Sequence, residues 1–337
     1  MKLAAYAFGL ASIAALSTDV HAQQAVADFY RGKTITILFG GSPGGGYDVD
    51  ARVLARHIGR FIPGNPSLVV QNISGARGLT SVNRLYSTSP KDGTYMGVVQ
   101  RGLLTSPWLN PTGVQFDLFK FNWLFSTAAE PGVAIIWKPP SKLSIDDLRT
   151  RETIIGGSGD SAIIPQVLNY TTGTKFKIIQ GYPGTADLVL AMERGEIQGI
   201  GYYSWSNIAS KNPTWLSEQK IQVVLQTGDH RSPQLPDVPT VTELAMDSGK
   251  RQVQDLWLSP LEFARPYAMP PETPKDRVTA VRAAFDEMLK SKDFQEDAQK
   301  SGMVVDPRSA EQIAALLNRI AKMAPAVIEE AKKAVND

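Results

Sequence analysis

The feature that most constrains this chain is a glycine-rich loop at residues 40–46. The loop follows an apolar run at residues 35–39 and precedes residues 49–61, where apolar side chains recur at helical spacing. This order predicts a strand, a tight turn and a helix N-terminus. The first amides of a helix are unpaired and carry partial positive charge, so the hollow that they form suits an anionic oxygen.

Three more loops of this kind lie between a predicted strand and a predicted helix, at residues 72–78, 156–161 and 182–186. Strands that alternate with helices predict parallel sheets covered by helices on both faces. In such sheets, ligands bind beyond the carboxyl ends of the strands, where these loops would lie. Any one loop could be a plain turn that needs glycine for its backbone. Four of them in two α/β units favour a protein that holds a small acid.

Local signals also predict where several helices begin and end. Asp48 is the expected N-cap of the helix after the first loop. Gly173 is expected to end the helix after the third loop. Ser309 and Gln312 have the spacing of a capping box, which predicts another helix start in the C-terminal part.

The first 22 residues have the pattern of a secretory signal peptide. Lys2 precedes an apolar run at residues 3–16, and small residues precede a cleavage site after Ala22. The run is too short for an ordinary transmembrane helix. We therefore expect an exported protein of the periplasm. The chain has no cysteine, which excludes disulfides and thiolate chemistry.

The charged residues argue against several classes of protein. The formal net charge is only +2, with both signs interspersed, which is unlike a nucleic-acid-binding protein. Arg52, Arg56 and Arg60 recur every four residues on the first predicted helix, which indicates a solvated stripe rather than a binding patch. His57 and His230 are the histidines that follow residue 22, and we expect structural or solvated roles for both. We therefore expect no metal site.

The glycines match two known phosphate-binding motifs only weakly. Gly44 and Gly46 begin a dinucleotide-binding pattern, but Val49 stands where its third glycine should be. The Gly-Lys-Ser/Thr sequence of a P-loop is missing from the first loop. We therefore expect no cofactor.

A secreted serine hydrolase is the alternative from another class. Residues 40–44 read Gly-x-Ser-x-Gly, which matches a nucleophile elbow with Ser42 as the nucleophile. The chain order permits Asp187 and His230 as later partners. Pro43 argues against this hypothesis, because the residue after the nucleophile should donate its N–H to the oxyanion hole and proline has none. Losing one such donor costs about two to three orders of magnitude in rate.

A set of motifs in order along the chain resembles a known family. Ser42-Pro43-Gly44-Gly45, Asp48 and Ala51-Arg52 match its strand-to-helix signature. The later matches are Asn72, Gly75-Ala76, Gly78, Asp92-Gly93, Tyr182, Gly184, Ala186, Gly195, Ile197, Arg231-Ser232-Pro233 and the proline-rich run 235–241. These residues resemble the Bug family, the extracytoplasmic solute receptors of tripartite tricarboxylate transporters. The likeness spans nearly all of the mature chain, and the proline-rich run is its most specific part.

The resemblance implies a two-domain periplasmic binding protein of the Venus flytrap, type II-like kind, without catalytic activity. Each domain would be a mostly parallel sheet flanked by helices. We expect residues 25–125 plus 255–337 to form domain I and residues 126–254 to form domain II, with the ligand cleft between them. The ligand would be a di- or tricarboxylate or an aromatic carboxylate. A monomer would deliver it to membrane permease subunits, or would instead report it to a signalling kinase.

This chain departs from the family pattern at two places in the expected site. Gly46-Tyr47 stands where two small hydroxylated residues are usual, and Arg77 stands where glycine is common. The residues expected to contact the ligand are Ser42, Gly44, Gly45, Gly46, Tyr47, Asp48, Gly75, Ala76, Arg77, Gly78, Arg101, Ser158, Ser161, Tyr182, Gly184, Thr185 and Tyr202. Arg77 and Arg101 are either charged clamps or surface residues. The tyrosines either line an apolar pocket or belong to the core.

Overall fold

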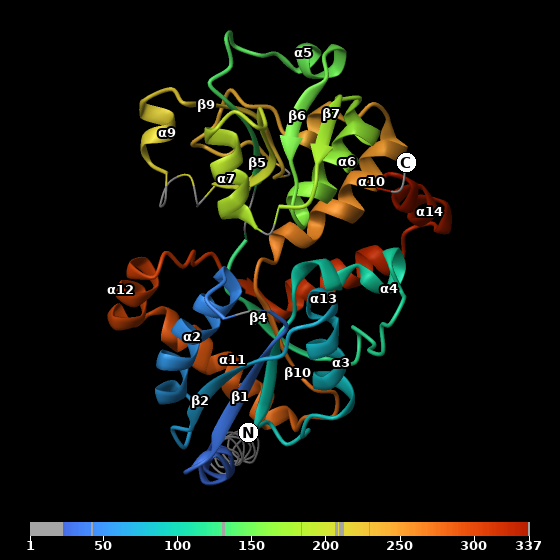
Figure 1. The fold of residues 1–337 in the computed structure, drawn as a ribbon. Helices are drawn as coiled ribbons and strands as arrows, with labels where there is room; N and C mark the ends of the chain where they lie inside the picture. The colour runs from blue at the N-terminus through green and yellow to red at the C-terminus, as the bar shows by residue number, and fades with distance from the viewer. Residues whose placement is uncertain are drawn as a thin grey trace, which may run out of the picture. The chain divides into compact units, whose positions relative to one another are not determined.

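The chain forms two compact α/β units in a computed structural model, drawn in Figure 1. The structure describes residues 23–41, 43–129, 132–182, 184–205, 208, 212–228 and 230–335. The expected signal peptide and Ser42 lie outside these described residues. Unit 1 comprises Met1–Leu103, Thr112–Thr127 and Arg265–Ala314, and unit 2 comprises Leu104–Pro111, Ala128–Ala264 and Ala315–Asp337. The expected division differs from these bounds, since it placed the whole of residues 255–337 in the first domain.

In the described part of unit 1, six strands form one sheet in the order β11-β4-β10-β3-β1-β2. The central strand β1 pairs in parallel with β2 on one side and β3 on the other. Strand β10 runs antiparallel to both β3 and β4, and β11 runs antiparallel to β4. The strands are β1 Thr34–Phe39, β2 Ser67–Asn72, β3 Tyr95–Val98, β4 Asn122–Ser126, β10 Pro266–Met269 and β11 Arg308–Ser309.

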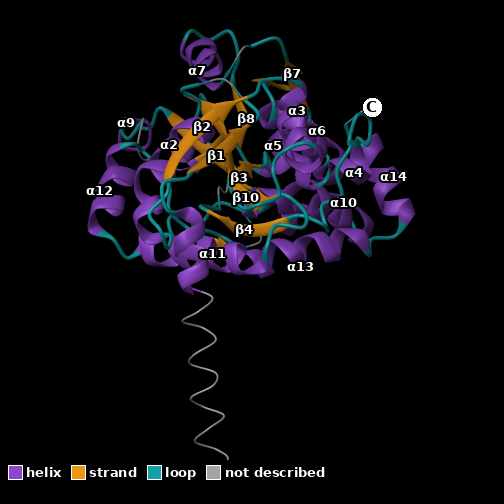
Figure 2. Cartoon of the chain, turned by 90° about the horizontal axis from the view of Figure 1, so that it is seen from below, coloured by secondary structure: helices purple, strands orange, loops and turns teal. Residues whose placement is uncertain are grey.

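Helices cover both faces of this sheet. Chain connections from β1 to β2 and from β2 to β3 run in opposite directions across the sheet, which puts their helices, α2 and α3, on opposite faces. Figure 2 shows α2 and α3 on either side of β1. The helical segments are α2 Gly46–Ile58, η1 Gly59–Phe61, η2 Ala76–Gly78, α3 Leu79–Ser87, η3 Arg101–Leu104, α11 Lys275–Leu289, α12 Lys292–Lys300 and α13 Ala310–Ala321. Both η3 and α13 continue past a boundary of unit 1.

The core of unit 1 is formed by apolar side chains that recur on the inward faces of its strands and helices. Ile35 and Ile37 on β1 and Leu54 on α2 are fully buried in one cluster. The rings of Phe125 on β4 and Phe285 on α11 stack with their centroids 3.6 Å apart. Burial of such side chains, each worth about 1.5–3 kcal/mol, holds α2 and α11 on the same face of the sheet.

Unit 2 repeats the central topology of unit 1 with a different sequence. The order of its described strands is β7-β6-β8-β5-β9, with β6 parallel to both β7 and β8 and β5 antiparallel to its two neighbours. The strands are β5 Gly132–Trp137, β6 Thr153–Gly156, β7 Phe176–Ile179, β8 Gly199–Ser204 and β9 Ile221–Gln226. The α/β fold class is confirmed. Each sheet is mixed, because β10 in unit 1 and β5 in unit 2 run antiparallel to their neighbours.

Helices also flank the sheet of unit 2. The described segments are α4 Ser106–Leu109, α5 Ile145–Thr150, α6 Asp160–Thr172, α7 Thr185–Glu193, α9 Thr214–Ser217, η4 Val241–Leu244, α10 Ser248–Leu258, η5 Ser259–Glu262 and α14 Pro325–Lys333. In the described part of the chain, no helix is long and apolar enough to cross a membrane.

Two of the three predicted helix boundaries are confirmed. Gly173 ends α6 in the left-handed conformation, with φ 76°. The Gln312 amide donates to Ser309 Oγ, and the Ser309 amide donates to Gln312 Oε1 at 2.8 Å, which completes the capping box before α13. The N-cap prediction for Asp48 is wrong. Gly45 is the N-cap of α2, because the glycine loop enters the helix three residues earlier than expected.

The arginine stripe, which runs along α2 into η1, is also different from the prediction. Arg56 and Arg60 reach α12, where they pair with Asp297 at 2.9 Å and Asp293 at 3.0 Å. The His57 Nε2 atom lies 2.8 Å from Asp297 Oδ2, which confirms a structural role for this histidine. The stripe therefore joins two helices rather than facing only solvent.

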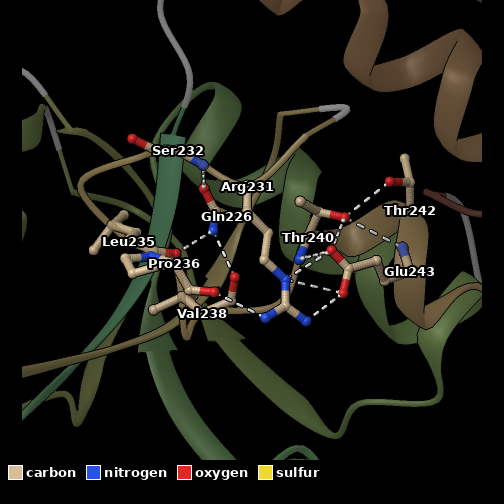
Figure 3. Close-up of polar contacts among 9 residues, drawn as sticks. All are labelled: Gln226, Arg231, Ser232, Leu235, Pro236, Val238, Thr240, Thr242 and Glu243. Atoms are coloured by element: carbon tan, nitrogen blue, oxygen red, sulfur yellow. Dashed lines mark hydrogen bonds and ion pairs between the residues drawn. The ribbon is translucent and has the colours of Figure 1, made fainter.

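The proline-rich segment that resembles the Bug signature is a structural brace in unit 2, shown in Figure 3. The Arg231 side chain donates to both carboxylate oxygens of Glu243 and to the Pro236 carbonyl. Gln226 donates to the Leu235 carbonyl at 3.0 Å and accepts from the Ser232 amide at 2.8 Å. Hydrogen bonds from Arg231 outweigh the opposing effect of burial and lower the pKa of Glu243 to about 2.

Candidate functional site

Three loops meet at the carboxyl ends of β1, β2 and β3 in unit 1. A Cβ atom added to Gly40 would lie 2.3 Å from the Gly78 Cα, so the first and second loops touch through bare backbone. The Gln100 side chain, just after β3, donates from Nε2 to the Gly40 carbonyl at 2.9 Å. The sequence predicted that the first two loops would gather at this edge. It did not predict the part played by Gln100.

The first loop presents unpaired amides to solvent. Gly44 has φ 84°, a conformation that favours glycine, and its N–H donates to Asp48 Oδ2 at 2.9 Å. Gly45 and Gly46 are exposed, and their N–H groups have no hydrogen-bond partner among the described residues. These two amides lie at the start of a 13-residue helix, where partial positive charge collects, and can bind an anionic oxygen.

Asp48 stabilises the conformation of this loop through hydrogen bonds. Its side chain is only 2% exposed, and Arg52 donates to it from Nε at 2.8 Å and from Nη2 at 3.0 Å. Asn72, at the end of β2, donates to the same carboxylate at 2.9 Å and to the Gly41 carbonyl at 3.0 Å. Burial alone would raise the pKa of Asp48, but hydrogen bonds from Arg52, Gly44 and Asn72 prevail and lower it to about 2. These contacts indicate that Asp48 positions the loop.

Tyr47 links the first loop to the segment that follows β3. Its ring stacks on Phe39 with centroids 5.7 Å apart and planes 5° apart, and its hydroxyl accepts from the Arg101 amide at 3.2 Å. The guanidinium carbon of Arg265 lies 4.1 Å from the centroid of the Tyr47 ring. The Tyr47 ring therefore contacts both Phe39 of β1 and Arg265.

Arg265 and Asp50 are the site residues that sequence reasoning missed. Arg265 Nε lies 3.1 Å from Asp50 Oδ2, and the two side chains are 12% and 8% exposed. A Cβ atom added to Gly46 would lie 3.2 Å from Arg265 Nη2. No local signal marks this pair, because 215 positions separate the two residues in the sequence (265 minus 50).

The second loop has an unusual backbone. Four residues in succession have positive φ: Gly75 at 141°, Ala76 at 45°, Arg77 at 54° and Gly78 at 90°. Left-handed geometry at a non-glycine residue costs about 1–3 kcal/mol. The Arg77 side chain is exposed, and no described residue forms a hydrogen bond or ion pair with it.

The loops of unit 2 use more of their polar groups internally. Ser161 Oγ donates to the Ser158 carbonyl and accepts from the Ser158 amide, both at 2.8 Å. Gly184 is the N-cap of α7, and Thr185 is exposed in the first turn. Each of α2, α6 and α7 has an acidic residue in its first turn, Asp48, Asp160 and Asp187, so this charge does not distinguish the loops. The first loop of unit 1 differs from the Ser158–Ser161 loop in that its Gly45 and Gly46 amides have no hydrogen-bond partner among the described residues.

The candidate tyrosines of unit 2 belong largely to its core. Tyr202 is 6% exposed in one core cluster, where its ring fills the space that a side chain at residue 132 would need. The adjacent Tyr203, which was not among the expected contacts, is buried in a second cluster, and its hydroxyl accepts from Asn212 at 3.0 Å. Tyr182 is half-buried against the same cluster.

The hydrolase alternative gains no support from the described residues. Ser42, its nucleophile, lies outside them. Asp187 and His230 are both exposed, and no hydrogen bond joins them. No group of three or more metal-ligating side chains occurs among the described residues either.

One curated relative and several solved structures are similar to this chain. No family model matches the chain. The chain is a homologue of the UPF0065 protein in the gbd 5′ region of Cupriavidus necator. The two are 23% identical over 333 residues, which cover 95% of this chain and 94% of the relative.

Solved structures of solute-binding proteins have the same fold. A TctC solute-binding protein from Polaromonas matches with a TM-score of 0.67 at 18% identity, over 91% of this chain and 99% of its own. MatC from Rhodopseudomonas palustris, solved with bound malate, matches with a TM-score of 0.59 at 20% identity. The match covers 90% of this chain and 99% of MatC. An R. palustris protein solved with adipate matches with a TM-score of 0.62 at 18% identity. The match covers 89% of this chain and 97% of that protein. The chain therefore has the periplasmic binding protein fold, which in these proteins serves binding and not catalysis.

Proposed function

We propose that this chain, a UPF0065 homologue with the fold of TctC solute-binding proteins, is a periplasmic receptor for a small organic acid. The observation that carries the proposal is the pair of exposed Gly45 and Gly46 amides at the N-terminus of α2, which have no hydrogen-bond partner in the described part of the chain. A carboxylate oxygen there would accept charge-assisted hydrogen bonds without any residue giving up an existing partner. Malate and adipate, bound by two proteins of the same fold, make linear dicarboxylates the first class to test.

The proposed contacts begin with the first two loops of unit 1. The first loop supplies the amides, Asp48 keeps them in place, and Ser42 and Tyr47 are the proposed side-chain contacts. The second loop at residues 75–78 supplies further backbone groups and the Arg77 side chain, and Arg101 follows the third strand. In unit 2, the proposed donors are Ser158, Ser161, Gly184 and Thr185, with Tyr182 and Tyr202 as apolar neighbours.

The remaining parts of the proposal concern export and delivery. The signal-peptide pattern of residues 1–22 supports secretion to the periplasm with cleavage after Ala22. A monomer would then deliver its ligand to the membrane permease subunits of a tripartite tricarboxylate-type transporter. The intact mass of protein purified from a periplasmic fraction checks the cleavage site, since the mature chain should begin at Gln23.

Thermal unfolding against a panel of acids tests the proposed function. The panel contains malate, adipate, citrate, acidic amino acids and aromatic carboxylates. A ligand at about 100 times its Kd stabilises the folded protein by about 2.7 kcal/mol, which should raise Tm by at least about 2 °C for a chain of this size. We expect this shift for one structural class of acid.

A flat panel, measured on protein shown by mass spectrometry to be free of co-purified ligand, would contradict the receptor hypothesis. The serine hydrolase would then be the next hypothesis, tested by turnover of activated esters and its loss in Ser42→Ala. If the panel is positive, deletion of the neighbouring permease genes separates transport from signalling. Only a transport receptor requires them for uptake of the acid.

A further inference from the structure

We infer that Gln100 is a specificity-determining residue of the ligand site, which selects acids that carry a hydroxyl or ammonium group near the bound carboxylate. The inference rests on the proposed function and deepens it, because it names a chemical class within the organic acids. Gln100 was not among the contacts expected from the sequence. Its side-chain oxygen accepts the hydrogen bond that such a group donates.

The segment that follows β3 contacts both ends of the first loop. Gln100 Nε2 donates to the carbonyl of Gly40, where the loop begins, at 2.9 Å. The amide of the next residue, Arg101, donates to the hydroxyl of Tyr47, which directly follows the loop, at 3.2 Å. The Gln100 side chain therefore borders the loop whose amides hold the carboxylate in the proposed function.

The Gln100 side chain also packs against the second loop. A Cβ atom added to Gly78 would lie 2.9 Å from Gln100 Cδ, 3.1 Å from Nε2 and 3.2 Å from Cγ, so the missing side chain at residue 78 leaves room for the amide. The Gln100 backbone is anchored as well, because its carbonyl accepts from the Leu103 amide at 2.8 Å. Contacts with two loops and an anchored backbone give the amide group a defined position.

These contacts also determine which way the Gln100 amide faces. A carbonyl accepts hydrogen bonds and cannot donate them, so Nε2 faces Gly40 and Oε1 faces away from it. Oε1 also lies farther from the added Gly78 Cβ atom than Cδ, Nε2 and Cγ do. The side chain is half-buried, and no described residue donates a hydrogen bond to Oε1. The protein therefore places an acceptor at the carboxyl edge of the sheet, where ligands bind in folds of this kind.

An acceptor at this place discriminates among acids by the group next to their carboxylate. A carboxylate oxygen only accepts hydrogen bonds, so it gains nothing from Oε1. A ligand hydroxyl or ammonium group donates to Oε1, whereas a methylene group in the same place would displace water and leave the acceptor unpaired. Sites that form a hydrogen bond with a polar group of the ligand reject the analogue that lacks this group. We therefore expect malate to bind more tightly than succinate.

Calorimetric titration of matched pairs of acids into the mature protein tests the inference. The pairs are malate with succinate, citrate with tricarballylate, and mandelate with phenylacetate, and the members of each pair differ by one hydroxyl. A hydrogen bond between neutral groups corresponds to about a 2-fold to 10-fold change in Kd. We expect the wild type to prefer the hydroxy acid by such a factor in the pair that it binds. Gln100→Met, which has a similar length and no amide, should lose this preference.

Two further variants separate selection of the ligand from support of the loops. Asp48→Asn changes the first loop without altering the Gln100 side chain, so it should weaken binding of both acids of a pair by the same factor. Gln252→Met makes the same substitution at an exposed position of α10 and should change neither Kd. Circular dichroism of each variant shows that it is folded.

The ratio of the two Kd values in a pair decides the question. If Gln100→Met weakens binding of both acids alike and keeps the wild-type ratio, Gln100 only supports the loops and the inference is wrong. Equal binding of the two acids by the wild type would also overturn the inference, even if Gln100→Met does not fold, and would leave the proposed function intact. If wild-type protein binds no acid of the panel, the proposed function fails and the inference fails with it.

Discussion

At the scale of single residues, the glycine loop after β1 depends on the buried side chain of Asp48. Asp48 binds the Gly44 amide, Arg52 and Asn72 at once, and these three partners come from the loop, from α2 and from β2. The carboxylate therefore ties the loop to the two elements on either side of it. The loop can expose free amides because another part of it is held firmly.

Asp48→Asn should lower the free energy of unfolding by about 2 kcal/mol at pH 7. The pKa of Asp48 is about 2 in the folded protein, below the ordinary value of 3.8, so the carboxylate stabilises the fold fully above about pH 4. This stabilisation is lost as the pH falls from about 4 through 2, where the folded state also takes up the proton. Urea unfolding of both proteins at pH 7 and pH 3 should show a smaller difference at the lower pH.

Asp28→Asn is the matched control, because Asp28 is exposed and pairs only with Arg31 and Gln24 at the surface. It should change stability by less than about 0.5 kcal/mol at either pH. An equal effect of the two substitutions would contradict the structural role given to Asp48.

Gly45→Pro should abolish binding of the acid while the protein stays folded. Gly45 has φ −73°, which proline adopts readily, so the substitution removes the amide hydrogen without changing the backbone there. Gly45→Ala keeps the amide and should bind with nearly the affinity of the wild type. Calorimetric titration of the best acid from the panel, with circular dichroism of each variant, checks this. Unchanged binding in Gly45→Pro would remove this amide from the site.

At the scale of elements, α2 is held at both ends by polar contacts and along its length by its apolar face. Arg52 binds Asp48 near its N-terminus, Arg56 reaches α12, and Arg60 of the following η1 reaches α12 as well. The four-residue spacing of the arginines was visible in the sequence. The acidic residues that receive them lie about 240 residues later, so the sequence could not reveal this helix pair.

Asp297→Ala should destabilise the protein by about 1–2 kcal/mol. Asp297 is 28% exposed and accepts from Arg56 Nε at 3.0 Å, from Arg56 Nη2 at 3.1 Å and from His57 Nε2 at 2.8 Å. The hydrogen bond from His57, opposed by burial and aided by Arg56, lowers the pKa of this carboxyl, so the stabilisation holds at neutral pH. Thermal unfolding at pH 7 measures the effect.

Glu296→Ala gives the comparison on the same helix. The Glu296 side chain is 68% exposed and lies 4.0 Å from Lys300, so its loss should change stability by less than about 0.5 kcal/mol. If both alanine variants unfold at the same temperature, the contact between α2 and α12 contributes little to stability.

At the scale of the whole molecule, each unit is built around the same three parallel strands with a crossover helix on either face. In unit 1 these are β2-β1-β3, and in unit 2 they are β7-β6-β8. No repeat is visible in the sequence, because a strand buried on both faces requires only apolar residues and not particular ones. The same reasoning explains how solved structures about 20% identical have this fold over nine-tenths of the chain.

The sequence by itself determined the α/β class, the glycine loops at the ends of strands, several helix boundaries and the kind of protein. These features depend on local backbone preferences and on short periodic patterns, which neighbours in the chain are enough to define. The N-cap of α2 was misplaced because a glycine loop can enter a helix at more than one residue.

Only the tertiary structure decided which polar groups remain available for a ligand. It shows that Asp48 uses the Gly44 amide, that Ser161 uses the Ser158 amide, and that Tyr202 is packed in the core. It also brings Arg265 and Asp50 beneath the first loop from distant parts of the chain. Hydrogen-bond partners and buried ion pairs are set by packing across the sheet, so no local pattern could have specified them.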